Sequence, residues 1–121
     1  MSELAVLGCT VEITSGQTAS AKVISTQPSS DMLVGQKGIY FGDIDVVLTS
    51  PTQGNYTTAS ATITIKGTAS DVLDINDNKA VQKEDSGSKT VTLTDPDSGE
   101  SISPTITVKI TDAGQTDVIA T

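Results

Sequence analysis

Asp74, Asn76 and Asn78 have the spacing of the oxygen ligands that begin a calcium-binding loop. The remainder of that motif is missing, because Lys79 stands where such loops have Gly and Asp85 stands where they end in Glu. The flanking residues alternate like strands, whereas calcium loops of this type lie between helices. The sequence therefore predicts a β-turn over Asn76–Lys79 that joins two strands, and it predicts no bound metal.

Cys9 and the pair Glu84 and Asp85 are the other residues that could do chemistry. A thiolate forms at neutral pH beside a base or a cation, and the chain has no His to serve as that base. Neighbouring residues on a strand point to opposite faces, so Glu84 and Asp85 cannot flank one glycosidic bond unless a turn intervenes. We expect Cys9 to be a small buried apolar residue, and we expect no catalytic residues, no cofactor and no enzymatic activity.

The composition narrows the classes of partner. The chain of 121 residues has 7 basic and 15 acidic residues, which gives a formal net charge of −8. Such a charge repels phosphate backbones and anionic lipid, so nucleic-acid binding is not expected. The core must be built from aliphatic side chains, because there are one Phe, two Tyr and no Trp. A thin core of this kind predicts either that a partner completes part of the apolar surface or that the chain relies on dense backbone ladders.

Most of the chain alternates between apolar and polar residues in short runs, which is typical of an all-β domain. Gly, Asn, Asp and Pro residues that favour turns separate the runs. The echo between Thr90–Asp95 and Thr107–Asp112, with Pro96–Gly99 between them, predicts a long hairpin. The sequence predicts one domain over residues 1–121 with strands near 5–7, 11–14, 21–24, 39–41, 44–48, 59–65, 72–75, 90–94, 105–110 and 117–119.

The sequence also bears on where the chain is made. No run approaches the roughly 20 apolar residues of a membrane span. The first residues lack the basic leader and the apolar core of a secretion signal. We therefore expect synthesis in the cytoplasm as a soluble chain, before any assembly step.

Two parts of the chain carry a distinctive order of residues. They comprise Ser25–Ser29 with Gly38–Gly42, and then Asn78–Val81, Glu84–Ser86 and Ile110–Val118. In this order they resemble the small PAAR-like proteins, which are the spike-tip proteins of contractile injection systems. The run Asp112-Ala113-Gly114-Gln115 beside a terminal strand is the most distinctive element of the resemblance.

The resemblance implies a compact conical body of short strands and tight turns. Such a body caps the blunt end of a trimeric β-helical spike (a VgrG-like protein) with one copy per trimer. It sharpens the spike for envelope penetration by a phage tail, a type VI secretion apparatus or an extracellular injection particle. The protein would be assembled into such a particle or a virion and would contact the target membrane only transiently. Many members hold an apical metal through His and Cys, but this chain has no His, so none is expected.

The resemblance implies a roughly three-fold symmetric docking base. Our hypothesis places this base in the two terminal segments, Met1–Val11 and Asp112–Val118, because they carry apolar residues on one side. The candidate docking residues are Leu4, Val6, Val11, Asp112, Gly114, Gln115 and Val118. A second hypothesis, from a different functional class, also fits the sequence. An immunoglobulin-like β-sandwich acting as an adhesion or surface-binding module would share the strands, the acidic charge and the Thr-rich faces.

Overall fold

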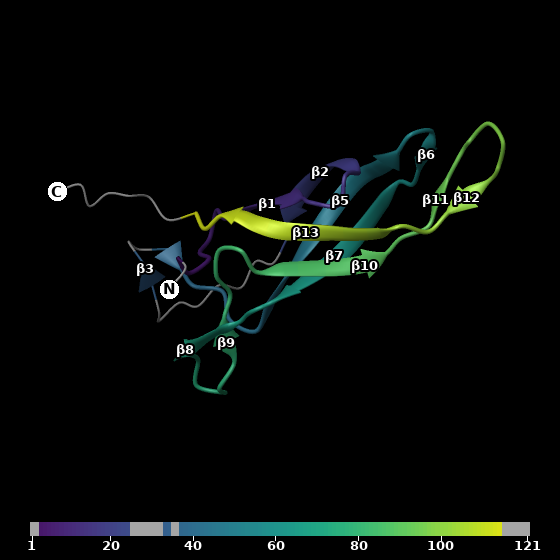
Figure 1. Cartoon of the computed structure of the whole chain (residues 1–121). Helices are drawn as coiled ribbons and strands as arrows, with labels where there is room; N and C mark the ends of the chain where they lie inside the picture. The colour runs from purple at the N-terminus through teal and green to yellow at the C-terminus, as the bar shows by residue number, and fades with distance from the viewer. Residues whose placement is uncertain (1–2, 25–32, 35–36, 115–121) are drawn as a thin grey trace.

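The alternation of apolar and polar residues produces strands throughout the chain, and the predicted all-β class is confirmed. The structure is a computed structural model that describes residues 3–24, 33–34 and 37–114 (Figure 1). These residues contain no helix, and their strands are β1 (Thr10–Ile13), β2 (Thr18–Val23), β3 (Leu33–Val34), β4 (Lys37–Gly38), β5 (Asp43–Gln53), β6 (Tyr56–Thr57), β7 (Ser60–Lys66), β8 (Ala69–Leu73), β9 (Lys79–Ala80), β10 (Ser86–Thr90), β11 (Leu93–Thr94), β12 (Ser101–Ile102) and β13 (Thr105–Asp112).

Two antiparallel sheets form the body. In one sheet, β13 lies between β1 and β10. In the other, the long strand β5 pairs with β2, β6 and β7, and β11 and β12 continue the sheet beyond β6. The β13 sheet lies over the β5 sheet (Figure 1), and residues of both contribute to one hydrophobic core. The body is therefore a two-layer arrangement with the apolar faces turned inward.

The core follows from period-two patterning, because alternate residues of a strand point to the same face. In β5, β7 and β13 the apolar residue of each pair is buried and its neighbour is at least partly exposed. Burial of such an aliphatic side chain contributes about 1.5–3 kcal/mol. The fully buried members are Ile44, Val46, Leu48, Ile63, Ile65, Ile106, Val108 and Ile110.

The long hairpin predicted near the C-terminus is present. Strands β10 and β13 pair from Ser86 with Lys109 to Thr90 with Thr105, and β11 and β12 extend the hairpin to its turn. The two echoed segments do not face each other, because the turn places Thr90 opposite Thr105. At its far end the hairpin joins the β5 sheet through Thr94 and Thr57.

The two sheets meet tightly along one side, where β7 and β10 lie together; we call this contact the closed seam. A Cβ atom at Gly87 would lie 2.1 Å from the carbonyl oxygen of Thr64, so only glycine fits there. The buried carboxylate of Asp85 accepts hydrogen bonds from the backbone N–H of Gln82 (2.9 Å), the backbone N–H of Thr68 (3.2 Å) and the Thr68 hydroxyl. These bonds tie the chain leaving β7 to the turn that leads into β10.

The N-terminal segment, residues 39–41 and the end of β13 assemble at one end of the body, which we call the terminal end. The backbone N–H of Val6 donates to the Ala113 carbonyl at 2.9 Å, and the Tyr40 N–H donates to the Ala5 carbonyl at 3.1 Å. Single bridges join Val6 to Ile39 and Phe41 to Ala80 where the sequence predicted full strands. The hairpin turn between β11 and β12 lies at the opposite end (Figure 1).

The predicted turn near Asn76 joins β8 to β9, but it begins two residues earlier, at Asp74. The Asp74 carboxylate accepts hydrogen bonds from the backbone N–H groups of Asn76 and Asn78, at 2.8 and 2.9 Å, and from the Asn78 side-chain amide at 3.0 Å. These bonds hold the pKa of Asp74 below its usual range, with the Asn78 side chain as the largest cause. The carboxylate that could have bound calcium instead builds the turn.

Candidate functional site

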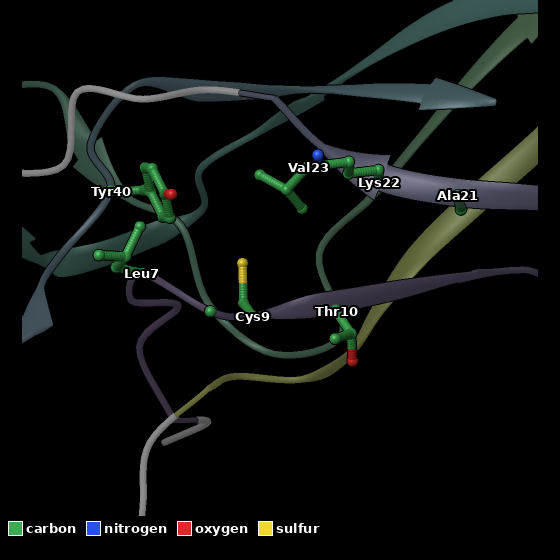
Figure 2. A pocket seen from close by; sticks show the side chains of 8 residues that line it. Leu7, Cys9, Thr10, Ala21, Lys22, Val23 and Tyr40 are labelled. Carbon is green, nitrogen blue, oxygen red and sulfur yellow. The ribbon is translucent and has the colours of Figure 1, made fainter. Parts of the chain in front are cut away.

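A pocket of about 340 Å³ opens between β1 and β2 at the terminal end (Figure 2). It arises because β1 and β2 follow each other in the chain but belong to different sheets. Within the described residues no ladder joins the two strands, and we call the gap between them the open seam. The lining residues are Leu7, Gly8, Cys9, Thr10, Ala21, Lys22, Val23 and Tyr40.

Cys9 and Tyr40 give the pocket its chemical character. The sulfur of Cys9 points into the pocket between Leu7, Tyr40 and Val23 (Figure 2). Burial raises the pKa of the Cys9 thiol to about 11, and the nearby negative charge of Asp112 adds to the shift. Burial also raises the pKa of Tyr40. Both groups are neutral at physiological pH, so the pocket offers an apolar surface and no thiolate nucleophile.

A second pocket of similar volume, about 340 Å³, follows the first along the open seam. Its apolar walls are Val11 and Ile13 from β1 and Ala19 and Ala21 from β2, and Ala21 lines both pockets. The small alanine side chains leave the space between the strands unfilled. The two pockets together form a groove along β1 and β2.

The mouth of the groove carries exposed apolar residues. Leu7 is 52% exposed and Ile24, which follows the pocket residue Val23, is 42% exposed. Large aliphatic side chains of this kind are costly to leave in water when they adjoin an apolar pocket. The terminal end therefore presents apolar surface to a partner, and the turn between β8 and β9 presents the still more exposed Ile75.

No family model, curated protein or solved structure matches the chain. The assignment of this surface consequently depends on its own geometry and on the residues that resemble spike-tip proteins.

The structure brings the two predicted docking segments together at the terminal end. The Val6 N–H donates to the Ala113 carbonyl, and the Cα of Gly114 packs so closely that a Cβ there would lie 2.6 Å from the Cys9 nitrogen. Asp112 is exposed and Leu4 is half-buried. Gln115 and Val118 lie outside the described residues.

The side chains of Val6 and Val11 are buried within the protein itself, where they pack in its own core clusters. The apolar residue that the N-terminal segment presents to solvent is Leu7, which sequence reasoning passed over together with Tyr40. The alternation of Ala19, Ala21 and Val23 was the signal that could have indicated the groove. It could not indicate which strand would lie opposite.

The other residues that could do chemistry, Glu84, Asp85 and Cys9, are placed as parts of the fold. The carboxylate of Glu84 forms a surface ion pair with Lys109 at 2.9 Å, whereas the carboxylate of Asp85 is buried. The two residues lie in the turn before β10, and not on a strand as the sequence had predicted. Cys9 is a buried free thiol, which confirms its predicted place in the interior.

Among the described residues, no three His, Cys, Asp or Glu side chains gather in a way that could hold a metal ion. A search of the same residues finds no helix able to cross a membrane.

Proposed function

We propose that the protein is a non-catalytic spike tip of a contractile injection system, and that it docks on its spike through the terminal end. The observation that carries the proposal is the meeting of two distant chain segments. The residues that most resemble spike-tip proteins, Asp112 to Gly114, lie against the N-terminal segment, which our hypothesis places in the same docking base because of its apolar residues.

The surface at this end supports docking by apolar contact. Leu7 is exposed beside a pocket in which the Cys9 thiol and the Tyr40 hydroxyl are neutral at pH 7, and the exposed Lys22 also lines this pocket. A trimeric platform that covers Leu7 and the pocket mouth would remove this apolar surface from water. It would also cover the outer edges of β1 and β2, which are open to aggregation when left unpaired.

The body has properties that suit a part that must resist force. Backbone ladders run through both sheets, and the two layers share one core of aliphatic side chains. The β11–β12 turn at the opposite end would point away from the spike. In this proposal the chain is synthesised in the cytoplasm, joins the particle as one copy per spike trimer, and meets the target envelope only during penetration.

A second function is favoured by one observation, the stacking of two antiparallel sheets. This is the general architecture of β-sandwich surface-binding modules, although strand layers alone do not determine function. A module of that class would bind through an exposed face or through loops, as a monomer or a self-associated species. Stoichiometry on a trimeric spike separates the two functions.

The proposal is tested by placing a charge at the mouth of the pocket. Leu7→Asp should abolish co-purification with the trimeric spike protein, because a carboxylate would have to be desolvated at the contact. Asn55→Asp adds the same charge in the exposed turn between β5 and β6, at the other end of the body, and should leave binding unchanged. Full binding by a folded Leu7→Asp protein would show that the docking surface lies elsewhere.

A further inference from the structure

Three side chains beside the closed seam meet around the hydroxyl group of Thr68. This hydroxyl donates a hydrogen bond to the Asp85 carboxylate, and its oxygen accepts one from the side-chain amide of Gln82 at 3.0 Å. The carbonyl carbon of the amide is bonded to the nitrogen that makes this contact. The hydroxyl group therefore lies between a carboxylate that can accept its proton and a carboxamide that its oxygen can attack.

The buried carboxylate of Asp85 fixes this arrangement through the backbone. One of its oxygens accepts the N–H groups of Thr68 at 3.2 Å and Gln82 at 2.9 Å, and the other accepts the Thr68 hydroxyl. The chain segments are also close here, because a Cβ atom at Gly67 would lie 2.4 Å from the Lys79 carbonyl oxygen. The three side chains are held together by the fold, which lowers the entropy cost of a reaction between them.

We propose that Thr68 and Gln82 form an ester bond within the chain, with Asp85 as the proton carrier. Asp85 accepts the hydroxyl proton while the Oγ1 atom of Thr68 attacks the Cδ atom of Gln82. The C–N bond of the tetrahedral adduct then breaks, and the nitrogen takes up the proton from Asp85 and leaves as ammonia. One C–O bond is formed and one C–N bond is broken, with no change of oxidation state.

The ester would fasten the chain that leaves β7 to the turn that leads into β10. It would close the β8–β9 hairpin into a covalent loop, because Thr68 precedes β8 and Gln82 follows β9. Each chain reacts once and consumes no external substrate. The inference does not rest on the proposed docking function, so either can fail without the other.

Mass spectrometry of the purified full chain tests the proposal directly. The folded protein should lose the mass of one ammonia molecule during incubation at neutral pH. Trypsin cleaves after lysine, so it should separate residues 67–79 from residues 80–83 in an unreacted chain. In the reacted chain these two peptides should remain joined, and fragmentation should place the link between Thr68 and Gln82.

Variants of Thr68 separate this reaction from other losses of ammonia. Thr68→Val removes the hydroxyl but keeps the backbone N–H that Asp85 accepts, and it should retain the full mass and two separate peptides. Thr68→Ser keeps a hydroxyl group and should still react. Circular dichroism checks that both variants are folded, and Gln82→Met, which lacks the amide, replaces Thr68→Val if that variant does not fold.

The exposed position of Thr68 adds a second product to look for. Water that opens the ester leaves Glu in place of Gln82, so conversion of Gln82 to Glu in the natural chain, and not in Thr68→Val, also supports the reaction. An unchanged mass with Gln82 intact in the folded natural chain would overturn the proposal. The same loss or conversion in Thr68→Val would overturn it as well.

Discussion

The two sides along which the sheets meet are built in opposite ways. At the closed seam, the backbones of β7 and β10 approach so closely that Gly87 has no room for a side chain, and the buried Asp85 ties the adjoining loops together. At the open seam, no ladder of backbone hydrogen bonds joins β1 to β2, and small side chains leave two pockets between them. One side is closed by backbone contact and a buried carboxylate, and the other carries two pockets.

The difference lies in how the chain crosses between the sheets. The short turn after β1 leads into a strand of the other sheet, so β1 and β2 cannot form a ladder with each other. Strand β10 is held by its hairpin with β13, and at Gly87 its backbone lies directly against the Thr64 carbonyl of β7. We infer that stability is concentrated at the closed seam and binding at the open seam.

The largest expected effect comes from adding volume to the closed seam. Gly87→Ala should lower the free energy of unfolding by about 3 kcal/mol, because its Cβ would collide with the Thr64 carbonyl. Ala21→Val adds volume at the open seam and should change stability by less than about 1 kcal/mol, since the pocket can take the extra methyl groups. Urea unfolding followed by circular dichroism measures both, and equal losses would erase the distinction between the seams.

A smaller effect is expected when the polar tie at the closed seam is removed. Asp85→Ala should destabilise the fold by about 2 kcal/mol, because the N–H groups of Thr68 and Gln82 lose a charged acceptor. The neighbouring change Glu84→Gln removes only a surface ion pair with Lys109 and should cost less than about 1 kcal/mol. A larger loss from Glu84→Gln than from Asp85→Ala would contradict the account of this seam.

The smallest expected effect is a loss of folding stability at alkaline pH, caused by the Cys9 thiol at the open seam. The thiol of Cys9 has a pKa of about 11 in the folded protein against an ordinary 9.0, so the unfolded chain releases this proton first. Its contribution to stability is complete below pH 9 and is lost as the pH rises toward about 11. The Cys9→Ala protein lacks this contribution and should lose less stability than the natural chain between pH 8 and pH 10.5.

Alkylation checks the same group independently. At pH 8, iodoacetamide should modify Cys9 slowly in the folded protein and rapidly in urea, because the thiolate is the reactive form. Equal rates in the two conditions would show that burial does not control the thiol.

Local patterns predicted much of the fold. Period-two alternation located β5, β7 and β13, and the turn residues Pro96–Gly99 indicated the long hairpin. The Asp74 turn was placed two residues late, because the stretch through Ile75 alternates like a strand while the Asp74 side chain ends it by capping the turn. In each case the signal lies within a few residues of the structure it predicts.

The candidate site was less predictable, because it depends on contacts between distant residues. Val6 and Val11 have the apolar pattern of a contact surface, but β13, Ile39 and the core cover them. Nothing local distinguishes Leu7, which stays exposed, from these two valines. The pockets likewise arise from strands that share a turn and diverge into different sheets, which alternation cannot reveal.

Native mass spectrometry of the protein with its trimeric spike tests the central claim most directly. If the terminal end with its open seam is a docking surface for a single tip, the complex should contain one copy of this chain and three spike chains. Leu7→Asp should remove that species, whereas Asn55→Asp should leave it. Three bound copies per trimer, or no complex under conditions where both proteins are folded, would contradict the account.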